Sequence, residues 1–318
     1  MIVLGIETSC DETSASIVKD FKVLSNVVKT QSVHIEYGGV VPDLASKDHE
    51  KKILNVVNAG IKEAKIDLCQ IDAIAVTYGS GLLGSLIVGL NFAKGLSVAL
   101  NIPLIGISHL VGHLSSSFIN SSIKYPHLSL IVSGGHTQIW IVENSKSYTV
   151  VANTVDDAAG EAFDKGARIL GLKYPGGPEI EKKSTHGDHK KYSFTIPEVK
   201  SNRFNFSFSG LKTALLYKKK ELDLYQKEYS TSDLAASYQH AIINSLLSKL
   251  ERVIKHYKIY DISIVGGVSA NLYFRKTAEF LKEKYSLEIK FPDMEYCTDN
   301  AAMIAMAGYL KLKNNKKV

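Results

Sequence analysis

One order of expected strands and helices occurs twice along this chain of 318 residues, and this duplication constrains the fold more than any other feature. Each half is expected to run three strands, a helix, a strand, a helix, a strand and a helix. The strand-like runs are rich in Val, Ile and Thr. Strands that alternate with long helices favour helix-covered sheets with parallel pairings. The sequence therefore predicts two similar α/β lobes with a central cleft.

The expected elements set the domain boundaries. In the first half, strands are expected at 2–6, 14–19, 23–30, 73–77 and 103–107, and helices at 43–65, 83–99 and 109–119. In the second half, strands are expected at 128–133, 137–142, 148–152, 262–266 and 287–291, and helices at 157–171, 233–257, 269–284 and 299–312. We expect one lobe from residues 1–120 with about 299–318, and another from 121–298 with an insertion at about 172–230.

The positive charge of the chain is concentrated in that insertion. Residues 182–229 hold 11 Lys and Arg against 5 Asp and Glu, whereas the other residues hold 27 of each. A local basic surface suits a polyanion such as RNA. A solvated face that keeps the protein soluble is the alternative, and charge alone does not decide between them.

The cysteines and the apolar runs predict a cytoplasmic protein. Cys10, Cys69 and Cys297 form no CxxC pair and no disulfide framework, which fits a reducing compartment. The first residues lack the basic start of a signal peptide. The apolar stretch 84–100 is short for a membrane span and contains Lys94, so no membrane partner is expected.

Two histidines four residues apart form a candidate metal site. Ser108 is a plausible N-cap, so His109 and His113 would lie on one face of a helix. Such a pair is more often structural than metal-binding. Asp299, expected at a similar helix start in the other half, favours the metal alternative, and two His with one Asp suit iron(II) or zinc. A zinc peptidase of the HExxH type is disfavoured, because Leu110 occupies the position of its general base.

Glycine turns and acidic residues supply further candidates. Gly134 and Gly135 follow a strand and could cradle phosphate oxygens, although a tight hairpin turn explains the pair equally well. Gly-rich turns at 79–85 and 266–271 lead into helices, whose amino ends favour anions. Asp156 and Asp157 are expected to cap the helix that follows them. The turn 174–178 is interpreted as the end of that helix.

These segments together resemble a known family. The chain is similar to the universal tRNA threonylcarbamoyladenosine synthases of the TsaD type, formerly described as glycoproteases. The matching segments cover essentially the whole chain in order: GIETSCDET (5–13), YGGVVPDLAS (37–46), HLVGH (109–113), VSGGHTQ (132–138), DDAAGEAFDKGARILGLKYPGGP (156–178), FSFSGLKTA (206–214), GGVSAN (266–271) and CTDNAAMIA (297–305).

The resemblance implies a duplicated actin-like ATPase fold of the ribonuclease H-like kind. It implies transfer of a threonylcarbamoyl group from threonylcarbamoyl-AMP to adenosine 37 of tRNAs that read codons starting with A. A paralogous actin-like partner subunit and a small ATPase of the same pathway are implied as partners. Glu181 stands where many members have Asp. The implied metal ligands are His109, His113 and Asp299; the implied substrate residues are Val132, Ser133, Gly134, Gly135, His136, Asp164, Gly177, Glu181 and Asn271; the catalytic candidates are Glu12 and His136.

Two other functional classes stay open on the residues alone. An actin-like kinase or ATPase acting on a small molecule would explain the glycine turns, but it leaves His109, His113 and the basic insertion without a role. A nucleotide-gated assembly subunit would bind nucleotide without stoichiometric metal. ATP turnover with and without tRNA, together with the metal content, separates these classes from the transferase.

Overall fold

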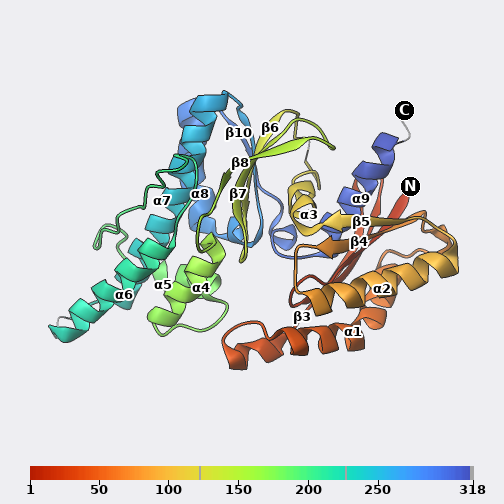
Figure 1. The fold of residues 1–318 in the computed structure, drawn as a ribbon, viewed down its shortest axis with the longest axis horizontal. Helices are drawn as coiled ribbons and strands as arrows, with labels where there is room; N and C mark the ends of the chain where they lie inside the picture. Colours follow the sequence, from red (N-terminus) through yellow and green to blue (C-terminus); the bar gives the residue numbers. More distant parts are fainter. Residues whose placement is uncertain (122, 226–227, 316–318) are drawn as a thin grey trace. The chain divides into compact units, whose positions relative to one another are not determined.

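The computed structural model describes residues 1–121, 123–225 and 228–315, and these residues form two compact units (Figure 1). Unit 1 comprises Met1–Ile123 and Pro292–Val318, and unit 2 comprises Lys124–Phe291. The predicted domain ranges include residues 122, 226–227 and 316–318, which lie outside the described residues.

Unit 1 is built on a five-stranded sheet in the order β3-β2-β1-β4-β5. β1 pairs antiparallel with β2 and parallel with β4, β2 pairs antiparallel with β3, and β4 pairs parallel with β5. The strands are β1 (Ile2–Glu7), β2 (Glu12–Lys19), β3 (Lys22–Thr30), β4 (Ala73–Gly79) and β5 (Leu104–Ser108).

Helices cover both faces of this sheet. Successive side chains of a strand point to opposite faces, and those of β1 pack into two different hydrophobic clusters, one on each face. Ile2, Leu4 and Ile6 pack with α1 and α2, whereas Val3 packs with α9. Gly5 permits that second contact, since a Cβ there would lie 2.3 Å from the Ala301 carbonyl oxygen. The helices are α1 (Pro42–Glu63), α2 (Leu83–Leu100), α3 (His109–Ser116) and α9 (Ala301–Asn315), with short 3-10 turns η1 (Ser32–Tyr37), η2 (Leu68–Gln70) and η4 (Met294–Tyr296).

Unit 2 repeats the sheet of unit 1 in the order β10-β9-β6-β7-β8. β6 pairs antiparallel with β7 and parallel with β9, and the outer pairs are β7–β8 antiparallel and β9–β10 parallel. The two sheets therefore share one pattern, as the duplication predicts. The strands are β6 (His127–Val132), β7 (Thr137–Val142), β8 (Tyr148–Asn153), β9 (Asp261–Val265) and β10 (Glu288–Lys290).

The insertion of unit 2 is part of its hydrophobic core. Phe194, Phe204, Phe206 and Phe208 are buried in the cluster that also contains the apolar side of α7. Each buried phenylalanine contributes roughly 1.5–3 kcal/mol by leaving water, so this segment is anchored despite its charge. The helices are α4 (Ala159–Ile169), α5 (Gly176–Ser184), α6 (Ser209–Leu224), α7 (Thr231–Tyr257) and α8 (Leu272–Tyr285), with a 3-10 turn η3 (Gly267–Ala270).

The structure corrects the predicted insertion, which contains helices α5 and α6 that the sequence analysis missed. The turn 174–178 was interpreted only as a helix stop, but α5 begins there. The carboxylate of Asp164 accepts a hydrogen bond from the Gly176 amide at 2.7 Å and so stabilises the first turn of α5. The preceding helix, α4, ends earlier, at Ile169, and Gly171 follows with a φ of 73°.

Other helix boundaries differ by a few residues. The last helix begins at Ala301 instead of 299, because Asn300 accepts a hydrogen bond from the Met303 amide in the manner of an N-cap. The helix expected at 109–119 ends at Ser116, and that expected at 269–284 begins at Leu272 after η3. Asp299 therefore lies in the loop before α9.

Within the described residues, α2 is the one helix whose length and composition would allow it to cross a membrane. Core helices of soluble proteins have the same length and composition. α2 packs against α1 and β4, and Leu86 and Ala93 are buried there. Leu83, Ile87 and Val98 are exposed.

Candidate metal centre and ligand loops

The histidine pair lies where β5 passes directly into α3. Ser108 occupies the N-cap position with extended backbone angles, although its side chain makes no capping hydrogen bond. His109 and His113 then fall one helical turn apart. Their ring centroids lie 4.6 Å apart, and both side chains are buried. The short α3 thus presents two imidazoles to the same point.

Asp299 completes a group of three possible metal ligands within unit 1. Its Oδ1 lies 3.1 Å from Nε2 of His113 and 3.5 Å from Nε2 of His109. One ligand atom from each of the three residues lies within 4.8 Å of the others. The structure therefore brings together the three residues that the sequence analysis proposed as ligands.

The bonding of His113 fits a metal ion at this point. Its side chain is wholly buried, yet neither ring nitrogen makes a hydrogen bond with the part of the chain that the structure describes. The approach of Asp299 to Nε2 is short, but it does not have hydrogen-bond geometry. A buried nitrogen without a partner is costly, and coordination to a cation would satisfy Nε2.

A carboxylate and a hydroxyl lie behind His109. Its Nδ1 is 3.0 Å from the Ser9 Oγ and 3.4 Å from the Glu7 Oε2. Glu7 is the last residue of β1, is fully buried, and also accepts hydrogen bonds from the Ser9 amide and the Thr77 hydroxyl. With the Nδ1 proton directed toward these acceptors, Nε2 keeps its lone pair for a metal ion.

The charges of this cluster are strongly coupled. Burial favours protonation of Asp299, but His109 and His113 outweigh it and hold its pKa well below the usual range. The pKa of Glu7 is also lowered, because His109 and Ser9 outweigh burial and the repulsion from Asp299. Burial opposes the charging of His109, yet the carboxylates of Asp299 and Glu7 raise its pKa well above its ordinary value.

Glu12, a catalytic candidate, begins β2 in the same unit. Burial raises its pKa to about 10, and the nearby carboxylates of Asp299, Asp11 and Glu7 contribute to this rise. Glu12 thus faces an excess of negative charge that a bound cation would relieve.

In unit 2, the predicted substrate residues begin with the hairpin between β6 and β7. The Ser133 amide donates to the His136 carbonyl at 2.9 Å, and the His136 amide donates to the Ser133 hydroxyl at 3.2 Å. Gly134 and Gly135 form the tip and are exposed, and in the described part of the chain no atom lies within 4 Å of a Cβ built on either. The hairpin interpretation is therefore correct, and this tip has room for a ligand.

Two of the predicted substrate acids also make backbone contacts. Asp164 binds the first amide of α5, and burial raises its pKa. The Oε1 of Glu181 accepts from the Leu272 amide at 2.6 Å, which ties α5 to the start of α8. Both acids have a structural role whether or not they bind substrate, and Gly177 lies between them in α5.

Asn271 follows β9 and η3 and is the N-cap residue of α8, and β9 lies next to β6 in the sheet. Its Oδ1 accepts from the Phe274 amide at 2.8 Å and its Nδ2 donates to Gln239 at 2.8 Å, so the amide is held at both ends. Val132 is close to this loop, because a Cβ on Gly266 would lie 2.5 Å from the Val132 carbonyl oxygen. The ends of parallel strands β6 and β9 thus carry several candidates, which is where open α/β sheets bind ligands.

One acid of the matching segments has a different role from the one predicted. Asp156 was expected to cap α4, but its Oδ1 accepts from the Phe208 amide at 2.7 Å and the Ser209 amide at 3.3 Å. It therefore caps α6 of the insertion. Asp157 pairs with Lys165 and Lys212, at 2.8 and 3.2 Å.

Glu7 and Ser9 were not predicted as support for the histidines. The signal was a carboxylate at the end of the first parallel strand, but only the fold shows that this strand end lies beneath His109. His49 of α1 was not predicted either; its Nε2 lies 3.0 Å from the Cys10 carbonyl and its Nδ1 lies 2.8 Å from the Thr13 hydroxyl. His49 thereby braces the chain on both sides of Glu12, the first residue of β2.

Comparison with known proteins gives consistent matches. The family profile described as TsaD, tRNA N6-adenosine threonylcarbamoyltransferase, matches residues 22–306. A protein of Thermosipho africanus (strain TCF52B) with that name is 52% identical over 311 residues, which are 97% of this chain and 94% of the relative. One of Caldicellulosiruptor saccharolyticus is 50% identical over 315 residues, 98% of this chain and 93% of the relative.

Solved structures share the fold at low identity. Full-length HypF, in its phosphate- and nucleotide-bound form, matches with a TM-score of 0.63 and 14% identity over 98% of this chain and 46% of that chain. The (R)-2-hydroxyglutaryl-CoA dehydratase component A of Acidaminococcus fermentans matches with a TM-score of 0.57 and 19% identity over 98% and 97% of the two chains. These neighbours are actin-like ATPase-fold proteins, and the predicted fold class is confirmed.

Proposed function

Because the chain belongs to the tRNA N6-adenosine threonylcarbamoyltransferase family, we propose that it transfers a threonylcarbamoyl group from threonylcarbamoyl-AMP to tRNA. The acceptor is the exocyclic amine of adenosine 37 in tRNAs that read codons starting with A, and AMP leaves. Similarity to relatives of this name over nearly the full chain is the observation that carries the proposal.

The chemistry requires positioning and polarisation. An adenine amine is a weak nucleophile because its lone pair is delocalised into the ring, so both reactants must be held in line. A metal ion held by His109, His113 and Asp299 would supply Lewis-acid polarisation of the carbamoyl group. Two nitrogens and a carboxylate suit iron(II) or zinc, and the metal content of the purified protein identifies which is bound.

The chain's own residues bind and orient the donor. We assign the exposed amides of Gly134 and Gly135 to the adenylate phosphate. The other assigned contacts and the catalytic candidates are Val132, Ser133, Asp164, Gly177, Glu181 and Asn271 for the adenylate, and Glu12 and His136 at the reacting atoms. The target base must leave its stack to reach the donor, which an anticodon loop permits more readily than a duplex.

The partners follow from the reaction and from the family resemblance. We propose a paralogous actin-like subunit and a small ATPase as partners, and a cytoplasmic location, where tRNA is modified. ATP turnover measured with and without tRNA distinguishes this function from a small-molecule kinase of the same fold.

The central test replaces both histidines. We expect the His109→Ala, His113→Ala double variant to lose bound metal and tRNA modification, because Asp299 alone cannot retain the ion. Metal content and nucleoside analysis of tRNA, incubated with the adenylate donor and candidate partners, measure both effects. The matched control is His186→Ala with His189→Ala, which removes two imidazoles from unit 2. Full activity in the first double variant would show that the metal role is wrong.

A further inference from the structure

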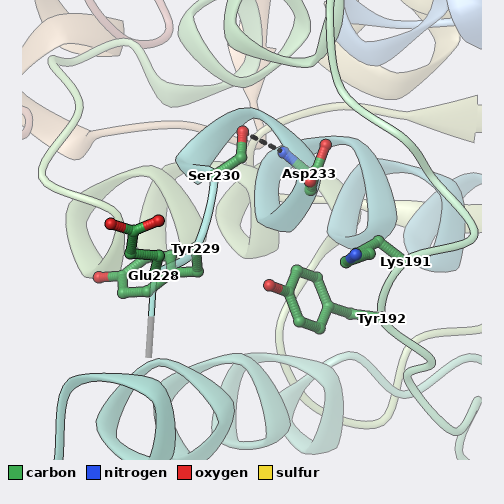
Figure 2. Close-up of a pocket in the computed structure, with 6 residues that line it drawn as sticks. All are labelled: Lys191, Tyr192, Glu228, Tyr229, Ser230 and Asp233. Atoms are coloured by element: carbon green, nitrogen blue, oxygen red, sulfur yellow. Dashed lines mark hydrogen bonds between the residues drawn. The ribbon is translucent and has the colours of Figure 1, made fainter. Parts of the chain in front are cut away.

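Two surface cavities of unit 2 are lined by none of the predicted substrate residues. The cavity in Figure 2, of about 490 Å³, is lined by Lys191, Tyr192, Glu228, Tyr229, Ser230 and Asp233. Its described lining residues contribute one ammonium, of Lys191, and two carboxylates, of Glu228 and Asp233, so their charge does not favour an anion. The second cavity, of about 420 Å³, differs in kind. This second cavity is here called the basic cavity, and it is lined by Arg203, Arg252, Lys255 and His256.

The framework of the basic cavity is fixed. The Arg203 carbonyl accepts hydrogen bonds from Lys249 Nζ and Arg252, both at 3.3 Å. Lys249 is fully buried and reaches Glu198 at 2.8 Å, and Arg252 binds the same carboxylate with two nitrogens at 2.7 Å. These contacts clamp the loop around Arg203 onto α7, so a ligand would meet a preorganised surface.

The local charge is positive after every ion pair is counted. Among the residues that the structure describes, the two carboxylates of Glu198 and Glu251 take part in all the ion pairs around the basic cavity. The cations around them are Arg203, Lys249, Arg252, Lys255 and Lys284. Arg203 is exposed and has no carboxylate within ion-pair distance among the residues that the structure describes. The excess charge therefore faces solvent.

Helix stability does not explain this arrangement by itself. Lys255 and His256 occupy the last turn of α7, where cations stabilise the helix dipole. Arg203 comes from the loop before α6 instead, and its NH2 lies 3.4 Å from Nδ1 of His256. When Nδ1 accepts this hydrogen bond, the neutral imidazole keeps Nε2–H as a donor.

Aromatic rings accompany these donors. The Arg203 guanidinium lies 5.0 Å from the centroid of the Phe204 ring, and the His256 ring lies 5.3 Å from the same ring. Tyr257 packs edge-on to His256 at 4.7 Å and is 38% exposed. Phe204 is buried and supports the Arg203 and His256 side chains from below, whereas Tyr257 offers an exposed ring beside them. Cationic donors beside an exposed aromatic ring are typical of surfaces that bind RNA.

We propose that the basic cavity docks the phosphodiester backbone of tRNA. This inference rests on the proposed function, which supplies the RNA, and it adds a contact surface outside the residues assigned to the adenylate. Arg203 and Lys255 would neutralise phosphates, and His256 would donate one further hydrogen bond.

The test removes the two side chains that face solvent and leaves the Glu198 clamp intact. Arg203→Gln with Lys255→Gln is compared with Lys51→Gln with Lys62→Gln, two exposed lysines of α1 in unit 1. Both pairs lower the net charge equally, so nonspecific attraction cancels. Unmodified tRNA binding is measured across a range of salt concentrations, and Trp140 fluorescence in urea verifies that unit 2 stays folded.

We expect the Arg203, Lys255 variant to bind tRNA about tenfold more weakly near physiological salt, with a salt slope smaller by roughly 2. In the modification assay its KM for tRNA should rise while kcat stays unchanged. The proposal would be wrong if both double variants lost the same tRNA affinity. It would also be wrong if the Arg203, Lys255 variant kept the salt slope of the wild type. Failure of the wild-type protein with its partners to modify tRNA would instead refute the proposed function, and the binding comparison would still test the surface.

Discussion

At the level of single residues, the candidate metal centre depends on Glu7, which is not one of the proposed ligands. The Oε2 of Glu7 lies 3.4 Å from the Nδ1 of His109. The other ring nitrogen of His109, Nε2, is the one that approaches Asp299. A carboxylate in this position fixes the tautomer and orientation of a ligating imidazole and raises its basicity. Glu7 is therefore a positioning residue for the proposed metal site.

We expect Glu7→Gln to weaken metal binding by about 10- to 100-fold. The amide nearly preserves the shape of the side chain but cannot act as an anionic acceptor for His109. Competition with a chelator measures the metal affinity without reference to activity. The control is Glu50→Gln, an equal loss of charge at an exposed position of α1. Unchanged affinity in a folded Glu7 variant would show that Ser9 alone orients the ring.

Two acidic residues of the matching segments bind backbone amides that the sequence did not predict. Asp156 was expected to cap its own helix, yet it caps α6, far along the chain. Asp164 supports the start of α5. Asp156 was recognised as a cap and Asp164 only as an implied substrate residue, but the amides that both bind belong to the insertion. Which amide lies within reach depends on packing, which local sequence does not specify.

At the scale of elements, close contacts between helices limit which side chains are tolerated. Gly166 of α4 faces α7, and a Cβ there would lie 2.2 Å from the ring of Tyr238. Tyr238 is fully buried, and its hydroxyl donates to the Ala162 carbonyl at 2.9 Å, so the ring cannot retreat without losing that bond. The glycine is thus required by the packing of α4 on α7.

Gly166→Ala should destabilise the protein by about 1–3 kcal/mol, because overpacking outweighs the gain in helix propensity. Gly95→Ala in α2 is the matched control. No atom of the described residues lies within 4 Å of a Cβ at Gly95, so alanine should stabilise that helix by roughly 0.5–1 kcal/mol. Urea unfolding followed by far-UV circular dichroism measures both changes. A neutral Gly166 variant would show that α4 and α7 can separate at little cost.

At the scale of the whole molecule, unit 2 contains groups that make it sensitive to acid. Burial lowers the pKa of His127 from 6.5 to about 4. The pKa of Glu198 falls from 4.5 to about 2 through its bonds to Arg252 and Lys249, and that of Glu251 falls equally, chiefly through Tyr285. All three groups bind protons more readily in the unfolded chain, so each contributes stability that acid removes.

We expect two steps of destabilisation as the pH falls. Stability should decrease by about 2–3 kcal/mol between pH 6.5 and about 4 as the unfolded state takes up a proton at His127. A further decrease should follow between pH 4.5 and about 2 from Glu198 and Glu251. Trp140, the one tryptophan of the chain, lies in β7 and reports urea unfolding of unit 2 at each pH.

The variant His127→Gln isolates the first step. It should flatten the dependence of stability on pH above about pH 4.5 and leave the second step in place. A wild-type protein whose stability does not change between pH 6.5 and 4.5 would contradict the assignment to His127.

Three features could be recognised before any coordinates were known: the repeated order of strands and helices, the histidine pair and the family resemblance. These features are local, because periodicity, turn residues and motif spacing are visible within short windows of chain. The confirmed actin-like fold follows from them. The roles of the proposed substrate residues stay predictions, since local patterns indicate which groups are present but not what they bind.

The folded structure was needed to show which distant groups meet. It joined the segment after Phe291 to unit 1, which brings Asp299 next to His109 and His113, and it put the end of β1 beneath His109. It also buried four phenylalanines of a basic insertion in the core of unit 2 and assembled the basic cavity from a loop and a helix end. Such contacts arise from the packing of complete sheets and helices, and no short stretch of sequence encodes them.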